Sequence, residues 1–278
     1  MPISIVEAMA EAGNAATLKA RHSQNFGRYL TSTALAGAFV GIAVVLLLSV
    51  KAPLVAAGSP FSALVGAAVF GIALTLVVFA GADLFTGNNM YMIQGLCTRA
   101  VKARELAGVW VASLIGNLVG SVAFAALVHA AGTLAAGATA GKPAPGIALV
   151  HKLIEAKNAA TGGQLFWRAA LCNMLVCLGL WMAMRTKSDG AKLAVLWWAL
   201  LAFIAAGFEH SVANMTLFSL GIFQGSATVG EMARNLAWTV PGNIVGGVIV
   251  GIAYAYLSGA RYPNEFNKPP ETLSLPRQ

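Results

Sequence analysis

Long apolar runs separated by short polar stretches dominate the pattern of this chain. A helix needs about 20 apolar residues to cross the hydrocarbon core of a bilayer, and six runs reach that length. The expected spans are Tyr29–Val50, Ala63–Cys97, Leu106–His129, Leu165–Met184, Leu193–Leu220 and Leu236–Leu257. The second and fifth are too long for one simple span and contain polar residues. The pattern therefore predicts an all-α membrane protein with six transmembrane helices, of which the second and fifth are interrupted.

The segments outside these runs divide the chain into three expected parts. Residues 1–27 precede the first run, and an amphipathic helix is predicted over 4–20, because Ser4 and Glu7 have capping-box spacing and apolar residues recur on one face. Such a helix lies on the membrane surface or on the bundle. Residues 28–260 form the six-helix domain, with a short helix expected at Ala148–Ala156 in its longest connection. The proline-rich tail, 261–278, is expected to be disordered.

Composition supports a membrane protein and excludes several other classes. Only 10% of the residues are charged and 58% are hydrophobic, whereas soluble domains have about 25% charged residues. The net charge of +8 does not indicate a nucleic-acid partner, because the basic residues are spread over short loops. The three cysteines form no CxxC pair and no metal-ligand spacing is present, so no metal or cofactor is expected.

The distribution of Lys and Arg among the loops predicts the orientation. One set of loops and termini is the more basic, and it contains Lys19, Arg21, Arg28, Arg99, Lys102, Arg104, Arg185, Lys187, Lys192, Arg261, Lys268 and Arg277. The other set contains Lys51, Lys142, Lys152, Lys157, Arg168 and Arg234. By the positive-inside rule, both termini are expected to be cytoplasmic.

A carboxylate and an imidazole stand side by side in the fifth run, at Glu209 and His210. Each ionised group at mid-membrane costs on the order of 2.5–3.5 kcal/mol, so the pair indicates a functional site. Gly207 precedes it, and a helix that breaks there frees backbone groups that lipid cannot satisfy. We therefore expect a cavity or pathway beside this break.

The same motif occurs earlier in the chain. Residues 81–88, GADLFTGN, align with residues 207–214, GFEHSVAN, at an offset of 207 − 81 = 126. Residues 116–120, GNLVG, align with 242–246, GNIVG, at the same offset, 242 − 116 = 126. Because each half would contain three spans, the halves are expected to be inverted in the membrane. Such inverted repeats place a permeation or binding site at their interface.

Two other classes of function, an enzyme and a water channel, fit these residues less well. Glu209 and His210 could serve acid–base chemistry with Ser211 as a nucleophile, but adjacent helical residues point about 100° apart and do not converge. The chain has no HExxH or GxSxG motif either, so an enzyme is not expected and remains a remote alternative. Asn88 and Asn214 lack the following Pro of water channels, which disfavours that function.

These motifs resemble the formate/nitrite transporter family, and within it the nitrite branch. The residues that carry the resemblance are 81–87, 207–215, Asn173 with 175–177, and 242–243, and it extends over roughly residues 5–258. The resemblance implies an aquaporin-like fold, a homopentamer with one pore per protomer, and two apolar constrictions flanking a central histidine. It also implies a multi-pass protein of the bacterial inner membrane.

The family's pore residues transfer to this chain position by position. The resemblance places Phe70 and Leu74 with Leu84 in the cytoplasmic constriction, and Val176 with Phe203 in the outer one. It implies that Thr86 faces His210 and hydrogen-bonds to it. Polar support around the histidine and the outer vestibule is assigned to Lys157, Asn173, Glu209 and Asn243.

The physics of these residues suits a small monovalent weak acid. Phe203 precedes His210 by seven residues, about 10 Å along a helix, and an apolar ring so close makes a bare anion pay a large desolvation cost. His210 either donates a proton, so that the anion crosses as a neutral acid, or stays neutral and only hydrogen-bonds the anion. Nitrite is the expected substrate, with protons as a partner, and formate, hydrosulfide or a short-chain carboxylate are the alternatives.

Overall fold

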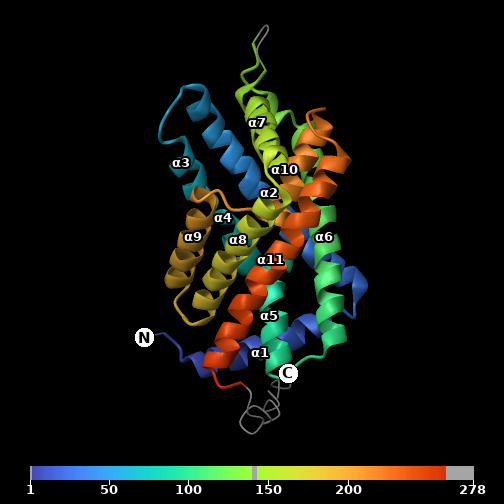
Figure 1. Cartoon of the computed structure of the whole chain (residues 1–278), viewed down its shortest axis with the longest axis vertical. Coiled ribbons are helices and arrows are strands. Elements are labelled where there is room, and N and C mark those ends of the chain that lie inside the picture. The colour runs from blue at the N-terminus through green and yellow to red at the C-terminus, as the bar shows by residue number, and fades with distance from the viewer. Residues whose placement is uncertain (1, 140–142, 261–278) are drawn as a thin grey trace, which may run out of the picture.

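The computed structural model describes residues 2–139 and 143–260, and its regular elements are helices packed into an elongated bundle (Figure 1). The elements are α1 (Ile5–His22), α2 (Phe26–Ala56), α3 (Ser62–Val69), α4 (Ile72–Phe79), α5 (Phe85–Cys97), α6 (Ala103–Ala130), the 3-10 turn η1 (Thr133–Ala135), α7 (Pro145–Ala159), α8 (Gly162–Met184), α9 (Asp189–Ala205), α10 (Ser211–Phe223) and α11 (Val229–Leu257). The predicted tail, 261–278, lies outside the described residues.

Five stretches of the described chain are long and apolar enough to cross a membrane: α2, α3 with α4, α6, α8 and α11. The single helices α2, α6, α8 and α11 correspond to the first, third, fourth and sixth predicted spans. The second predicted span is divided into α3, α4 and α5, and the fifth into α9 and α10. The interruptions expected in these two spans are therefore present.

Both interruptions have the same form. The chain leaves helical geometry between α4 and α5 and again between α9 and α10. Gly81 and Gly207 follow the ends of α4 and α9, with φ of 77° and 70°. These are left-handed values that glycine adopts without steric cost. A further turn at Phe70–Gly71, between α3 and α4, was not predicted.

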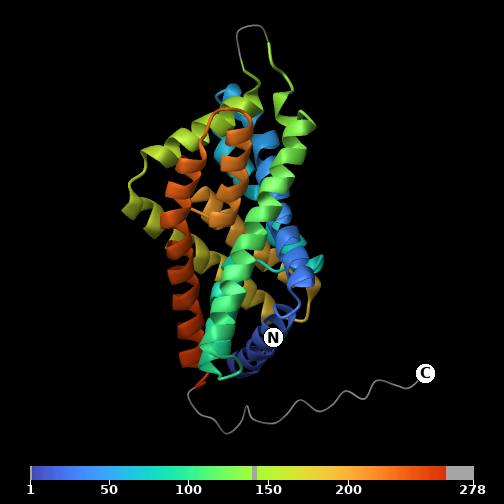
Figure 2. The same cartoon turned by 90° about the vertical axis from the view of Figure 1, so that its right-hand side faces the viewer.

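The long helices pack in pairs through small residues. α2 lies along α6, and α8 along α11; Figure 2 shows α6 and α11 running through much of the bundle. A Cβ on Gly120 would overlap the carbonyl of Ala34, and a Cβ on Gly246 that of Ala170. Small residues let membrane helices approach this closely, so that van der Waals packing holds them together.

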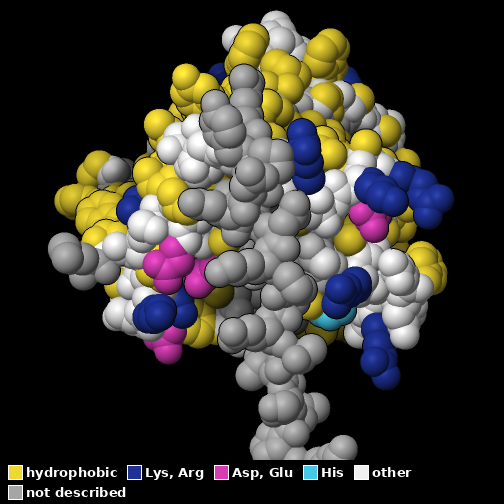
Figure 3. All heavy atoms as spheres, turned by 90° about the horizontal axis from the view of Figure 1, so that it is seen from below, with side chains coloured by type: hydrophobic (Ala, Val, Ile, Leu, Met, Phe, Trp, Pro, Cys, Tyr) yellow, Lys and Arg dark blue, Asp and Glu magenta, His cyan; other side chains and the backbone are white. Residues whose placement is uncertain are grey.

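The helix predicted over 4–20 is α1, and it lies on the bundle. Ser4 Oγ accepts the Glu7 N–H at 3.1 Å and starts the helix. Its buried face includes Met9 and Ala16 and packs on α5. The first and last described residues lie at this same end of the bundle (Figure 1). Figure 3 views that end, where Lys and Arg side chains are prominent. The helix predicted at 148–156 is the longer α7, at the opposite end.

Candidate functional site

The two helix breaks meet in the middle of the bundle, at His210 and Thr86. His210 is the N-cap residue of α10, and its Nδ1 accepts the Ala213 N–H at 3.2 Å. Its Nε2 lies 3.1 Å from Oγ1 of Thr86, in the first turn of α5. The contact predicted between these two side chains is therefore present. Because Nδ1 is an acceptor, Nε2 carries the hydrogen of a neutral ring and donates it to Thr86.

Asn243 of α11 holds the break that precedes α10. Its Oδ1 accepts the Ser211 N–H at 2.9 Å, and its Nδ2 donates to the Glu209 carbonyl at 3.0 Å and the Ala169 carbonyl at 2.8 Å. One buried amide thus satisfies two backbone groups that the break frees, at Glu209 and Ser211, and ties them to the backbone of α8 at Ala169. This is how a break can persist where lipid offers no partner.

Asn117 of α6 does the same for the break that precedes α5. Its Oδ1 accepts the Phe85 N–H at 2.8 Å, and its Nδ2 donates to the Asp83 carbonyl at 3.1 Å and the Thr33 carbonyl at 2.7 Å. The aligned GNLVG and GNIVG motifs therefore have the same task in the two halves of the chain.

Asn173 of α8 links the break before α5 to the long helix α11. Its Nδ2 donates to the Thr86 carbonyl at 3.0 Å and the Asn243 carbonyl at 2.7 Å, and it lies 3.1 Å from Oδ1 of Asn89. The family resemblance assigned Asn173 and Asn243 to polar support around the histidine and the outer vestibule. In the structure both act on backbone groups, and so hold the histidine indirectly.

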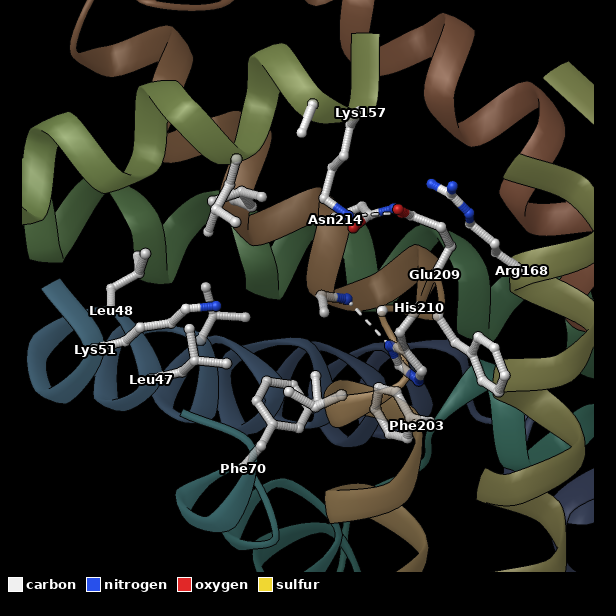
Figure 4. Close-up of a pocket in the computed structure, with 18 residues that line it drawn as sticks. Leu47, Leu48, Lys51, Phe70, Lys157, Arg168, Phe203, Glu209, His210 and Asn214 are labelled. Atoms are coloured by element: carbon white, nitrogen blue, oxygen red, sulfur yellow. Dashed lines mark hydrogen bonds and ion pairs between the residues drawn. The ribbon is translucent and has the colours of Figure 1, made fainter. Parts of the chain in front are cut away.

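Glu209 belongs to a buried ion pair. Its Oε2 lies 2.6 Å from Nζ of Lys157 on α7, and it accepts a hydrogen bond from Asn214 at 2.7 Å (Figure 4). The side chains of Lys157 and Glu209 are 16% and 5% exposed. The resemblance assigned both residues to the polar support of the outer vestibule without pairing them, and the ion pair leaves the positive charge of Lys157 compensated.

A second ion pair of the same kind was missed by the sequence reasoning. Lys19 Nζ on α1 lies 3.0 Å from Oδ1 of Asp83, which also accepts a hydrogen bond from Asn88 at 2.6 Å. The alignment of Asp83 with Glu209 was a signal that both acids need a cation. The cation itself could not be located, because it lies outside the aligned motifs.

Two cavities flank the His210–Thr86 contact. The Glu209 vestibule has a volume of about 280 Å³, and among its lining residues are Lys51, Lys157, Arg168, Phe203, Glu209 and His210 (Figure 4). The Asp83 vestibule has a volume of about 450 Å³, and among its lining residues are Lys19, His22, Leu84, Asp83, Asn88 and Tyr91. Each vestibule therefore contains one lysine–carboxylate pair.

A much smaller cavity lies at the centre. Its volume is about 10 Å³, roughly the space that one water molecule needs. Its lining consists of Val40, Phe70, Ala73, Leu74, Leu84, Val176, Leu200, Phe203 and His210. All five predicted constriction residues are in this set, and His210 is its one polar side chain. The lining shares His210 and Phe203 with the Glu209 vestibule and Leu84 with the Asp83 vestibule.

Phe70 contacts the residue that was assigned to the other constriction. Phe70 was placed in the same constriction as Leu74 and Leu84, opposite Phe203. In the structure the rings of Phe70 and Phe203 meet edge to face with centroids 5.7 Å apart, and both line the Glu209 vestibule. Phe203 also stacks on His210 at 5.9 Å. The turn after α3 carries Phe70 to this side of the central cavity.

Comparison with known proteins settles the family. The model of the formate/nitrite transporter family matches residues 5–257. The chain belongs to this family. It is 40% identical to the nitrite transporter NirC of Salmonella typhimurium over 93% of this chain and 94% of that protein. It is also 39% identical to a probable formate transporter of Methanothermobacter thermautotrophicus, over 83% of this chain and 88% of that protein.

Solved structures agree with the fold of this family member. A channel of the same family superposes with a TM-score of 0.81 at 38% identity, over 90% of this chain and 98% of that chain. A pentameric formate channel with formate bound superposes with a TM-score of 0.71 at 26% identity, over 84% of this chain and 98% of that chain. The resemblance seen in the motifs is thus confirmed.

Proposed function

We propose that this protein is a membrane channel for nitrite, with formate as the alternative substrate. The observation that carries the proposal is the central cavity, an almost closed apolar passage with His210 as its one polar side chain, between two vestibules. Identity of 40% to a nitrite transporter favours nitrite. Identity of 39% to a probable formate transporter keeps formate as the second candidate.

The matched contacts support an aquaporin-like architecture of six spans in an inverted 3+3 repeat. Asp83 and Asn117 align with Glu209 and Asn243, since 209 − 83 = 126 and 243 − 117 = 126. Each aligned pair makes corresponding hydrogen bonds. Both ends of the described chain lie at the end where basic side chains are prominent, which supports cytoplasmic termini in a bacterial inner membrane. Likeness to a pentameric channel supports a homopentamer.

An anion that crosses the central cavity must lose its water, because there is space for only about one molecule there. A bare monovalent anion pays a large penalty for this step, whereas the neutral acid does not. Protons are therefore part of the proposed transport. Nitrite, formate and hydrosulfide all have neutral conjugate acids accessible near neutral pH, and nitrate does not.

Of the two roles considered for His210, hydrogen bonding by the neutral ring fits the geometry better. The lone pair of Nδ1 already accepts the Ala213 N–H. A protonated ring would set its own Nδ1–H against that N–H and break the cap of α10. The neutral ring presents Nε2–H to Thr86 and, when the permeating acid displaces Thr86, to that acid. The proton that neutralises the anion then comes from water in the vestibule and not from His210.

The test is flux into liposomes that contain the purified protein, with nitrite, formate, hydrosulfide and nitrate compared at several pH values between about 5 and 8. Nitrite uptake should be the fastest and should rise toward low pH, and nitrate should not enter the liposomes. Protein-free liposomes are the control, and analysis of the recovered solutes should show no chemical turnover. Nitrate entry as fast as nitrite entry would contradict passage as a neutral acid.

A further inference from the structure

Lys51, near the end of α2, lines the Glu209 vestibule and is not explained by the pathway described above. It is half-buried, and Figure 4 shows its ammonium group among the residues that line this cavity. A lysine near the end of a membrane helix usually extends its amine toward the lipid headgroups. Lys51 instead contributes to the wall of the cavity that leads to His210.

The charge of Lys51 has no partner among the described residues. Lys157 is paired with Glu209 at 2.6 Å, but no carboxylate lies within 4 Å of Lys51 and no hydrogen bond to its ammonium is formed in the described part of the chain. The charged group that interacts with Lys51 is the ammonium of Lys152 on the neighbouring helix α7, and the two positive charges repel each other. An unpaired, partly desolvated cation beside another cation is costly, and a bound anion would relieve that cost.

The stem of Lys51 is held by its surroundings. Gly66 of α3 lies against it, and a Cβ at that position would come within 3.0 Å of Cδ and 3.5 Å of Cβ of Lys51. The Leu47 side chain lies at the same place, 3.5 Å from that Cβ position. Packing of α2 on α3 thus limits where the ammonium group can go, in contrast to a freely exposed surface lysine.

The balance of charge in the vestibule makes this residue important. Lys157 and Glu209 cancel each other, so the ion pair gives the cavity little net potential. Lys51 and Arg168 remain as cations that line the cavity without an ion-pair partner in the described chain. A cleft lined by charges of one sign raises the local concentration of the opposite ion and its rate of entry.

We propose that Lys51 is the anion-recruiting residue of the Glu209 vestibule, which binds the incoming monovalent anion ahead of the Lys157–Glu209 pair. This inference rests on the proposed function for the identity of the anion. It differs from that function in assigning capture to an unpaired lysine, and not to the lysine nearest His210.

The first experiment compares Lys51→Met with Lys51→Arg in nitrite flux assays. Loss of the charge should raise the half-saturating nitrite concentration about fivefold at low ionic strength. The effect should shrink below about twofold in 1 M salt, where the Debye length is about 3 Å. Lys51→Arg should behave like the wild type. Lys152→Met is the matched control, since it removes an exposed charge from the same end of the bundle and Lys152 does not line the cavity. It should change the half-saturating nitrite concentration less than about twofold.

Flux that is equal in wild type and Lys51→Met overturns the inference, and so does an equal loss in the Met and Arg variants, which would indicate packing. If Lys51→Met does not assemble, Lys51→Gln takes its place. Wild-type protein that carries neither nitrite nor formate would refute the proposed function instead.

The second experiment does not depend on transport. Ala156→Cys places a thiol on the exposed face of α7 that lines the vestibule. Its rate of reaction with a negatively charged methanethiosulfonate, relative to a positively charged one, reports the potential in the cavity. This ratio should fall about fivefold when Lys51→Met is added at low salt. An unchanged ratio overturns the inference whatever the flux measurements show.

Discussion

The Lys157–Glu209 ion pair gives a quantitative test of the geometry, through the substitution Lys157→Met. The two atoms are 2.6 Å apart, and the Glu209 side chain is only 5% exposed. Removal of one partner of a buried pair costs about 3–5 kcal/mol, because an uncompensated charge stays buried. The lower end, about 3 kcal/mol, is expected here because the hydrogen bond from Asn214 at 2.7 Å remains.

The double variant Lys157→Met/Glu209→Gln should recover most of this loss, because no charge is then left without a partner. A coupling free energy of about 2 kcal/mol between the two positions is expected for atoms in such close contact. The matched control is Lys192→Met, which breaks an exposed pair with Asp189 at 3.0 Å. Exposed pairs contribute about 0–1 kcal/mol, so this variant should be nearly neutral.

The assay is unfolding of the detergent-solubilised protein by increasing fractions of SDS. Labelling of the buried thiols of Cys172 and Cys177 reports the exposure of the core, since both are fully buried when folded. If Lys157→Met is no more destabilising than Lys192→Met, the pair behaves as a solvated surface contact. The positive charge of Lys157 would then not be neutralised by Glu209 in the vestibule.

Three further predictions concern the central cavity and the two helix breaks beside it. His210→Asn should change the rate of nitrite uptake or its pH dependence, and wild-type behaviour in both would exclude a role for the ring. Phe203→Ala and Leu74→Ala should each raise the leak of normally excluded anions such as nitrate, and unchanged selectivity would show that these side chains do not form the constriction. Asn243→Leu leaves two buried backbone groups at the break, Ser211 N–H and the Glu209 carbonyl, unpaired at about 1–3 kcal/mol each, so it should lower thermal stability, and Asn117→Leu should match it.

Much of the fold follows from the length of the apolar runs, because only a helix can hide its own polar backbone in lipid. The breaks at Gly81 and Gly207 were also visible, since each glycine lies two residues before a carboxylate in an apolar run, which is unusual for a continuous span. The turn at Phe70–Gly71 was not visible, because apolar residues flank it on both sides. This turn brings Phe70 against Phe203, a contact that the hydrophobic pattern does not predict.

The repeat alone locates only the site residues that lie in its motifs, and the family resemblance was needed for the others, such as Phe203 and Lys157. Lys19 and Lys157 serve equivalent carboxylates, but they are 157 − 19 = 138 residues apart, whereas those carboxylates are 126 apart. The connections in the two halves differ in length, so a fixed offset cannot find the pair. Lys51 has no counterpart in the repeat either, and only the cavity reveals that it faces the pathway.

Within the aligned motifs, the two halves differ at the positions whose side chains meet at the centre. The offset of 126 pairs Leu84 with His210, since 210 − 84 = 126, and Thr86 with Val212, since 212 − 86 = 126. The polar members come from different halves, and they meet as one hydrogen bond of 3.1 Å at the centre. Of the apolar members, Leu84 lines the central cavity. A cavity of about 10 Å³ with a single polar contact cannot hold a chain of water molecules. In the proposed mechanism, the passage therefore offers one hydrogen-bond partner to a dehydrated molecule, and it gives a hydrated ion or a chain of water molecules no continuous route.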